Sequence, residues 1–358
     1  MSRPSRAPHL PRWRRVLALL GATALALPLA ACTRAESEGG TIALLLPDAK
    51  TARYETFDRP VFEDRVAELG DYRVMYTNAD GDAAKQQQQA ESALASGARV
   101  LVLDPVDSRA AASIVNQANA QGVPVIAYDR MIEGGRLDYY ISFDNEKVGT
   151  LQAQALVEGL SAEGRADDGI LMVNGSPTDS NAAQFRAGAL EILEDAGLDI
   201  LASYDTPDWS PDKAQDWVAG QLTRYGDDIA GVYAANDGIA GGAISAMKAE
   251  NISPWPIVTG QDADLAAIQR ILTGDQHMTV YKALKTQAER AADVAVALLN
   301  GDEVTAPTTV GGVPATLLDP VAVTIDNIRE TVVDDGFWTI EDICTSAYED
   351  ACARAGLQ

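Results

Sequence analysis

Histidine, cysteine and positive charge are scarce in this chain of 358 residues. It has two histidines and three cysteines, and its 52 acidic residues outnumber 28 lysines and arginines, for a formal net charge of -24. No histidine lies near a cysteine in the sequence, so we expect no metal site, and no cofactor either. Nucleic acid is not an expected partner, because phosphate binding needs a basic face. A Gly-x-x-x-x-Gly-Lys-Ser/Thr phosphate loop is also missing, so this chain is not expected to hydrolyse ATP itself.

The N-terminal segment is not expected to belong to the fold. Its beginning contains five arginines and no acid: Arg3, Arg6, Arg12, Arg14 and Arg15. The apolar stretch 16–31 is too short and too early for an ordinary membrane span, and it ends in small residues before Cys32. This pattern is similar to a bacterial lipoprotein signal, cleaved before Cys32 with lipid on its sulfur.

We therefore predict a signal peptide at 1–31 and a polar tether at 32–40. The mature protein would cross the cytoplasmic membrane and stay at its outer face, held by the lipid anchor alone. Two alternatives remain open: an ordinary secretory signal with an incidental cysteine, and a twin-arginine signal at Arg14-Arg15.

Cys344 and Cys352 would then lie in an oxidising compartment, where a disulfide is expected. On one continuous helix their Cα atoms would be about 12 Å apart. A disulfide allows only about 4.4–6.8 Å. We therefore predict a disulfide in the C-terminal tail, with a helix break between the two cysteines. Two free buried thiols are the alternative.

Short apolar runs alternate with longer amphipathic segments in the first part of the chain. The runs that predict strands are Thr41–Leu46, Tyr72–Tyr76, Arg99–Leu103, Val123–Ala127 and Tyr139–Phe143. Segments 82–96 and 107–121 between them predict helices, and we interpret Gln86–Gln89 as a solvated helix face. This alternation favours a parallel sheet with helices on both faces.

The alternation then repeats, and the length suits about two domains of ~150 residues. The later predicted strands are Gly169–Val173, Ile200–Tyr204, Gly231–Ala234 and Ile257–Gly260. The fold class is therefore α/β, with two doubly wound parallel-sheet lobes. We expect the chain to cross between them at Phe143-Asp144, at Val280–Lys282 and after residue 316, which makes a three-segment hinge.

Polar side chains follow two neighbouring predicted strands of the first lobe. Asp129 and Arg130 come directly after the strand ending near Ala127, and Asp144 and Asn145 follow Phe143. The carboxyl ends of strands are where open α/β sheets contact ligands. Carboxylate, guanidinium and amide groups together satisfy hydroxyls, which both donate and accept, so they suit a small neutral polyol. Asp144 could instead serve only as a helix cap.

Several segments resemble the D-xylose-binding proteins of bacterial ABC importers, a group within the type I periplasmic binding proteins. The segments that carry this resemblance are Tyr128–Ile132, Phe143–Gly149, Gly175–Pro177, Asn236-Asp237, Gly260–Leu265 and Met278–Lys282. It extends over roughly 41–338. The resemblance implies a first lobe of residues 41–143 and 282–317, and a second lobe of 144–281 and 318–340. Residues 341–358 would form the tail with the disulfide.

The resemblance also implies a ligand site between the lobes. The matching positions are Lys50, Arg53, Tyr54, Asp129, Arg130, Asp144, Asn145, Trp209, Asn236, Asp262 and Lys282. Tyr54 stands where the family has a tryptophan, and Trp209 would stack on the sugar from the second lobe. No residue is expected to be catalytic. The implied partners are a monosaccharide, D-xylose or a related aldose, and a permease and an ATPase encoded elsewhere; the protein is expected to be a monomer. Alanine at Asp129 or Arg130 is expected to abolish binding with little loss of stability.

Two other classes remain open from the sequence. Asp129 and Asp144 could serve as the acid and base of a glycosidase, although both would lie beside Arg130, which favours their ionised forms. A sugar-sensing receptor subunit would use the same pocket and differ only in its partner.

Overall fold

The computed structural model describes residues 39–357, which belong to one compact unit, Ser37–Gln358. The predicted signal at 1–31 and the predicted lipidation site Cys32 lie outside the described residues. Within the described part of the chain, no helix combines the length and apolar character needed to cross a bilayer.

The first lobe is built on a seven-stranded sheet in the order β11-β12-β5-β4-β3-β1-β2. Its strands are β1 (Thr41–Leu46), β2 (Arg73–Asn78), β3 (Ala98–Leu103), β4 (Val125–Tyr128), β5 (Tyr139–Phe143), β11 (Thr308–Val310) and β12 (Val313–Leu318). All neighbours are parallel except β11 and β12. The central strands are buried on both faces, which explains their continuous apolar runs.

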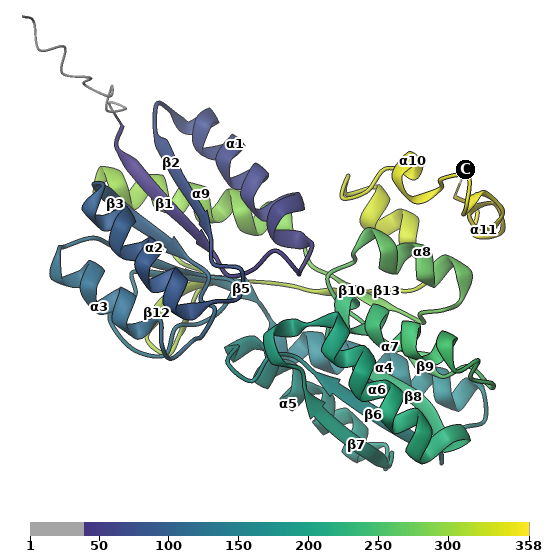
Figure 1. Cartoon of the computed structure of the whole chain (residues 1–358). Helices are drawn as coiled ribbons and strands as arrows, with labels where there is room; N and C mark the ends of the chain where they lie inside the picture. Colours follow the sequence, from purple (N-terminus) through teal and green to yellow (C-terminus); the bar gives the residue numbers. More distant parts are fainter. Residues whose placement is uncertain (1–38, 358) are drawn as a thin grey trace, which may run out of the picture. The chain divides into compact units, whose positions relative to one another are not determined.

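Four helices cover this sheet (Figure 1). They are α1 (Arg59–Leu69), α2 (Ala83–Ala95), α3 (Ala112–Ala120) and α9 (Leu284–Asn300). Apolar residues of α1 and α9 share one core cluster with the sheet, and those of α2 and α3 share another. The two clusters occupy opposite faces because successive strand residues such as Ala43 and Leu44 belong to different ones.

The second lobe is built on a four-stranded parallel sheet in the order β7-β6-β8-β9. Its strands are β6 (Gly169–Asn174), β7 (Ile200–Asp205), β8 (Ile229–Ala234) and β9 (Ile257–Val258). Its helices are α4 (Asn145–Ala162), α5 (Ser180–Asp195), α6 (Pro211–Tyr225), α7 (Asp237–Ala249) and α8 (Leu265–Thr273). Helices α4 and α5 approach so closely that a Cβ at Gly149 would lie 1.9 Å from the carbonyl oxygen of Phe185. The predicted α/β fold with two parallel sheets is confirmed.

The chain passes between the two sheets after Phe143, after Tyr281 and after Leu318. The last two crossings pair with each other, since β10 (Thr279–Tyr281) is antiparallel to β13 (Val321–Val323). The lobe boundaries given by residue number stay predictions.

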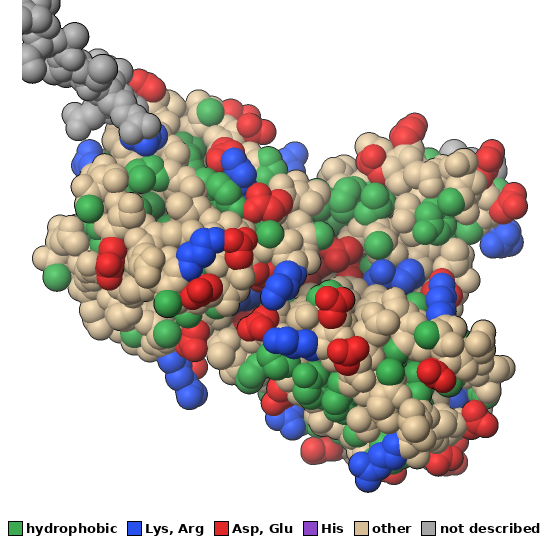
Figure 2. Space-filling view, in the orientation of Figure 1, with side chains coloured by type: hydrophobic (Ala, Val, Ile, Leu, Met, Phe, Trp, Pro, Cys, Tyr) green, Lys and Arg blue, Asp and Glu red, His purple; other side chains and the backbone are tan. Residues whose placement is uncertain are grey.

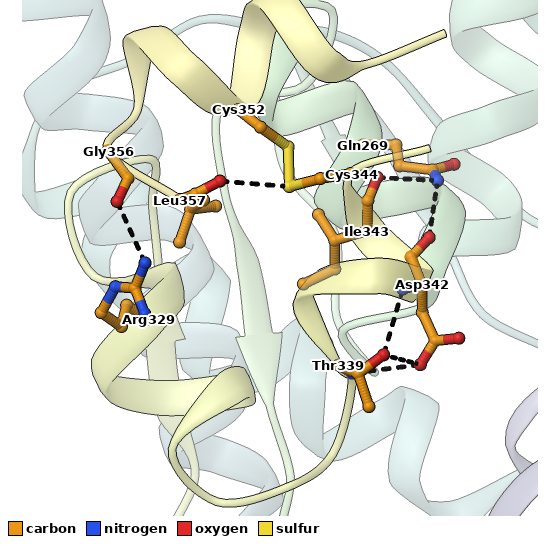
Figure 3. Close-up of a disulfide and its surroundings, with 9 residues drawn as sticks. All are labelled: Gln269, Arg329, Thr339, Asp342, Ile343, Cys344, Cys352, Gly356 and Leu357. Atoms are coloured by element: carbon orange, nitrogen blue, oxygen red, sulfur yellow. Dashed lines mark hydrogen bonds between the residues drawn. A yellow bond between two sulfur atoms is a disulfide. The ribbon is translucent and has the colours of Figure 1, made fainter. Parts of the chain in front are cut away.

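The C-terminal segment packs on α8 (Figure 3). It contains a π-helical turn η4 (Arg329–Val333) and two short helices, α10 (Ile340–Ile343) and α11 (Glu349–Arg354). A disulfide joins Cys344 to Cys352 with their Cα atoms 5.9 Å apart, and the chain is not helical between α10 and α11. Gln269 of α8 donates hydrogen bonds to the carbonyl oxygens of Asp342 and Ile343, which ties the segment to the second lobe.

An aromatic cluster connects this segment to the first lobe. Phe57, in the π-helical turn η1 (Tyr54–Asp58), stacks on Phe337 with ring centroids 4.1 Å apart. Trp338 packs edge-on against Phe57 and donates from Nε1 to the carbonyl oxygen of Ala263 at 2.8 Å. The cluster therefore contacts η1 and the turn around Ala263 at once.

The interpretation of Gln86–Gln89 as a solvated face is wrong for Gln86, whose side chain is 1% exposed. Gln86 donates to the carbonyl oxygen of Asp104 at 2.7 Å and accepts from the backbone N–H of Val106 at 2.9 Å. The side chain thus satisfies a buried loop at the end of β3, and that loop places Asp104. A local helical pattern contains no information about such a distant partner.

Candidate functional site

The first lobe contributes a buried arginine at the start of η1. The guanidinium of Arg53 contacts both oxygens of Asp58, at 2.8 and 2.7 Å. It also donates to Asp129 at 2.8 Å and to Gln287 of α9 at 2.6 Å. The side chain is 2% exposed, so the two carboxylates compensate its charge in place of water.

Asp129 follows β4 in the left-handed backbone region, with φ of 60°. This conformation is costly for a non-glycine residue and is commonly kept at functional sites. Hydrogen bonds hold it, because its carbonyl oxygen accepts from Ser142 Oγ at 2.6 Å and from Asn181 Nδ2 at 3.2 Å. Burial acts to raise the pKa of Asp129, but the charges of Arg53, Lys282 and Arg130 outweigh it and lower the pKa to about 2. Asp129 is therefore a carboxylate at any working pH.

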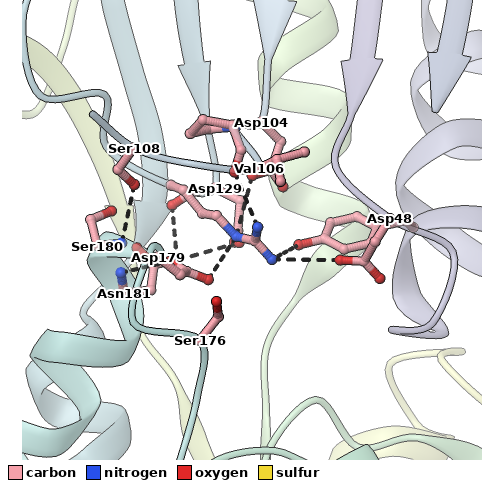
Figure 4. A network of polar contacts seen from close by, with 12 residues as sticks. Asp48, Asp104, Val106, Ser108, Asp129, Ser176, Asp179, Ser180 and Asn181 are labelled. Atoms are coloured by element: carbon pink, nitrogen blue, oxygen red, sulfur yellow. Dashed lines mark hydrogen bonds and ion pairs between the residues drawn. The ribbon is translucent and has the colours of Figure 1, made fainter. Parts of the chain in front are cut away.

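Arg130 lies among three carboxylates. They belong to Asp48, Asp104 and Asp179, which Figure 4 labels. Its Nε is 2.7 Å from Asp179 and 3.5 Å from Asp104, and its Nη2 is 3.8 Å from Asp48. It also donates to Tyr54 Oη at 3.0 Å and to the carbonyl oxygen of Pro105 at 3.1 Å. All three acids are at most 4% exposed. Burial raises the pKa of Asp104 well above its ordinary value, although Arg130 opposes the shift.

The second lobe contributes residues from the ends of its strands and the starts of its helices. Asp179 caps α5, and Asn181 and Phe185 lie in the first turns of that helix. Trp209 follows β7, also with positive φ, and donates from Nε1 to Asp179 at 2.9 Å. Asn236 caps α7, accepting from the N–H of Ile239 at 2.9 Å.

Lys282 and Asp262 meet at the hinge. Lys282 Nζ lies 2.8 Å from Asp262 Oδ1, and both residues are nearly fully buried. The ammonium also lies 5.4 Å from the ring centre of Phe143. Asp262 adopts φ of 103°, so the second lobe, like the first, presents its carboxylate from a strained backbone.

These residues surround one cavity of about 270 Å³ of empty space, counting the part open to solvent. It is lined by Thr51, Arg53, Tyr54, Asp129, Arg130, Asp179, Asn181, Phe185, Trp209, Asn236, Gln261, Asp262 and Lys282. Three cations face three carboxylates in this set, so the lining is close to neutral. Figure 2 shows acidic and basic side chains mixed on the face where the lobes meet.

Eight of the eleven sequence-predicted ligand residues line this cavity, and three do not. Lys50 is exposed, because Asp48 accepts from the N–H groups of Lys50 and Thr51 in a tight turn that directs Lys50 to solvent. Asp144 is exposed and caps α4 by accepting from the N–H of Lys147. Asn145 is buried but donates to Gln184 at 2.9 Å and Ser142 at 3.3 Å instead. The geometry therefore does not support ligand contact for these three residues.

Five lining residues were missed by the sequence reasoning: Thr51, Asp179, Asn181, Phe185 and Gln261. A signal was present for three of them. Asp179 and Asn181 follow the end of β6, and Gln261 precedes Asp262 in a segment already singled out. The strand-end rule that found Asp129 applies equally to them. Phe185 lies inside a helix, where the same apolar pattern predicts only core packing.

Three lining residues hold a buried oxygen that accepts no hydrogen bond from any described residue: Asn181 Oδ1, Gln261 Oε1 and Asp262 Oδ1. Asp262 Oδ1 has the charge of Lys282 beside it, but the two amide oxygens do not, and their side chains are at most 3% exposed. An unmet buried polar atom costs about 1–3 kcal/mol. The cavity is therefore suited to a ligand that donates hydrogen bonds.

A buried acid beside the cavity predicts a pH dependence of stability. Asp237 is 1% exposed and accepts from Thr279 Oγ1 and Gln276 Nε2. Burial raises its pKa to about 7; Arg270 opposes this shift and Asp262 adds to it. A carboxyl with a raised pKa stabilises the fold below its unfolded pKa of about 3.9, and this contribution is lost as pH rises through about 7.

We therefore expect the free energy of unfolding to fall between about pH 4 and pH 7. Asp237→Asn, which imitates the protonated form, should flatten this fall, as measured by denaturant titration across that range. The exposed Asp216→Asn should leave the slope unchanged. An equal slope in Asp237→Asn and the unsubstituted protein would contradict the assignment.

Two parallel α/β sheets linked at three crossings, with a polar cavity at their strand ends, define a type I periplasmic binding protein fold. The family model described as the periplasmic binding protein domain matches residues 42–303, and the chain belongs to this family.

Several relatives of the chain are named for sugars. The chain is 40% identical over 304 residues to the D-xylose-binding periplasmic protein of Escherichia coli (strain K12), a match that covers 83% of this chain and 90% of that protein. It is 30% identical to the multiple sugar-binding periplasmic receptor ChvE of Rhizobium radiobacter, over 92% of this chain and 99% of that protein. Among solved structures it is similar to an ABC transporter solute-binding protein from Clostridium phytofermentans with bound β-D-glucose. That match has a TM-score of 0.78 and 28% identity, and it covers 85% of this chain and 99% of the other.

Proposed function

We propose that this protein is the extracytoplasmic binding component of an ABC importer, and that it captures a monosaccharide, D-xylose or a related aldose, between its lobes. The observation that carries the proposal is the cavity itself. It combines a nearly neutral charge balance with buried acceptors that lack donors and with the aromatic rings of Tyr54, Phe185 and Trp209.

Each feature of the cavity matches one property of a sugar ring. Hydroxyl groups would donate to Asn181 Oδ1 and Gln261 Oε1 and would accept from the cationic side chains. Aromatic rings suit the C–H faces of a pyranose. A charged ligand would upset the balance of three cations and three acids, so an uncharged ligand is favoured.

Similarity to proteins named for sugars narrows the ligand further. D-xylose is the preferred candidate because a D-xylose-binding protein is 40% identical. The relatives named for several sugars and for glucose keep other aldoses within the proposal.

A glycosidase is disfavoured by the position and charge of the candidate carboxylates. Asp144 caps α4 and does not line the cavity. Burial raises the pKa of Asp129, but neighbouring cations outweigh this effect and lower it to about 2, so Asp129 cannot hold a proton to donate near neutral pH.

The proposal has three further parts. The protein delivers the captured sugar to a permease, it is anchored through lipid on Cys32, and it is a monomer. A receptor role is a second candidate, because ChvE is named as a receptor.

A thermal-shift screen tests the proposal. We expect saturating D-xylose to raise the Tm, because ligand that binds only the folded form adds about 2.7 kcal/mol at a hundredfold excess over Kd. The aldonic acid of the same sugar is the control, and its carboxylate should weaken binding about tenfold or more. The proposal fails if no pentose or hexose shifts the Tm.

A further inference from the structure

One short segment of the second lobe makes a series of contacts with the first lobe. This cross-lobe segment, Thr178–Asn181, contains the end of the loop between β6 and α5 and the first two residues of α5. The N–H of Ser108 donates to the carbonyl oxygen of Thr178 at 3.0 Å, and Thr178 Oγ1 donates to the carbonyl oxygen of Val106 at 3.2 Å. The N–H of Ser180 donates to Ser108 Oγ at 3.1 Å. Figure 4 shows Ser180 facing Ser108 across the two lobes. Each of these hydrogen bonds joins the two lobes directly and does not need a bound sugar.

Asp179 is the charged member of the segment, and one of its oxygens serves both lobes. Its Oδ2 lies 2.7 Å from Arg130 Nε in the first lobe and accepts from Trp209 Nε1 in the second lobe at 2.9 Å. Both Arg130 and Trp209 line the cavity. The position of the guanidinium and the position of the indole ring are therefore linked through a single carboxylate oxygen.

Separation of the lobes would break this pair without isolating either charge. Arg130 would keep Asp104, Asp48, Tyr54 Oη and the carbonyl oxygen of Pro105, all from the first lobe. Asp179 would keep the indole N–H of Trp209 and the N–H of Asn181, both from the second lobe. Because each charged group keeps partners in its own lobe, this ion pair can open and close reversibly. A buried ion pair without such partners would leave an uncompensated charge when it broke.

We propose that Asp179 is a positioning residue that latches the lobes together. The ion pair of Asp179 with Arg130 and the hydrogen bonds of the cross-lobe segment together populate the closed form in the absence of sugar. They also fix the positions of the Arg130 guanidinium and the Trp209 ring. This rests on the proposed function only where sugar affinity is concerned. A latch changes the fraction of binding-competent protein, so its loss weakens every sugar by one common factor. A direct contact to one hydroxyl would weaken sugars unequally.

Asp179→Asn removes the charge and keeps the shape of the side chain. Its one amide oxygen can keep either the cap of α5, now made by Oδ1, or the bond from Trp209, now made by Oδ2. The matched control is Asp168→Asn, which removes an equal charge from a surface ion pair with Arg165 inside the second lobe. Hydrogen exchange is measured on the amides of Ser108 and Ser180, both donors to the other lobe, without sugar. Calorimetry then gives the affinity of each variant for every sugar that binds.

We expect exchange at both amides to become about tenfold faster in Asp179→Asn, and affinity to fall by a similar common factor for all sugars, with Asp168→Asn unchanged. Unaltered exchange in Asp179→Asn would overturn the latch, and so would a loss of affinity confined to one sugar. If no sugar binds any variant, the proposed function fails while the exchange result still decides the latch.

Discussion

Replacing Asp129 by asparagine is expected to weaken sugar binding at least about a hundredfold. The carboxylate lies where the charges of Arg53, Lys282 and Arg130 converge, and these outweigh the effect of burial and lower its pKa to about 2. An amide at this position would leave those cations undercompensated and would lose the charge-assisted hydrogen bonds available to a ligand hydroxyl. Isothermal titration calorimetry with the tightest-binding aldose measures the loss.

The fold should survive this change. Arg53 would keep its hydrogen bonds to both oxygens of Asp58 and to the amide oxygen of Gln287, so the carboxylate of Asp58 still compensates its charge. Because the pKa of Asp129 lies below that of an unfolded aspartate, its own contribution to stability is present above about pH 4 and is lost as pH falls toward about 2. Circular dichroism at neutral pH should therefore show a folded variant with a somewhat lower Tm.

Asp144→Asn is the matched control for this experiment. Sequence reasoning placed Asp144 among the ligand contacts, but the residue caps α4 at an exposed position, and asparagine caps helices about as well. Its affinity should stay within about threefold of the unsubstituted protein. Equal losses in Asp144→Asn and Asp129→Asn would show that the cavity described here is not the ligand site.

The fold was predictable because its signals are local. Apolar runs of five or six residues, each followed by a helical segment, correspond to the observed strands within one or two residues for most of the chain. The strand-end rule located Asp129 and Arg130, since parallel strands present their carboxyl ends at one edge of a sheet, whereas Asp262 came from the family resemblance. The break between Cys344 and Cys352 followed from the distance that a disulfide allows.

The direction of individual side chains was not predictable. Lys50 and Asp48 are two residues apart, yet one side chain is exposed and the other is buried within 3.8 Å of Arg130. The turn that separates them depends on two hydrogen bonds to Asp48 that no composition rule implies. Gln86 and Asp179 were missed for the same reason, since their partners lie far away in the sequence.

The expectation that Arg130 can be removed with little loss of stability is revised by its surroundings. Arg130 is the cation among Asp48, Asp104 and Asp179, and both oxygens of the fully buried Asp104 lack a hydrogen bond from any described residue. Removing one partner of such a buried group costs about 3–5 kcal/mol, because the remaining charge stays uncompensated. Arg130→Met, which keeps much of the side-chain volume, should therefore lose stability as well as sugar binding.

The pH dependence of Arg130→Met distinguishes this cause from lost packing. Burial already raises the pKa of Asp104, and removing Arg130 raises it further. A carboxyl with a raised folded pKa contributes stability at low pH, and this contribution disappears as pH rises. The loss of unfolding free energy in Arg130→Met, relative to the unsubstituted protein, should therefore be small near pH 5 and large near pH 8. Denaturant unfolding at both values measures it.

Adding Asp104→Asn to Arg130→Met should restore much of the stability near pH 8, because the uncompensated charge is gone, and it should not restore binding. Arg136→Ala, which removes an exposed arginine paired with Asp138, should cost less than about 1 kcal/mol at either pH. If Arg130→Met were as stable as the unsubstituted protein near pH 8, the three acids would not depend on Arg130. The guanidinium would then belong to the ligand site alone.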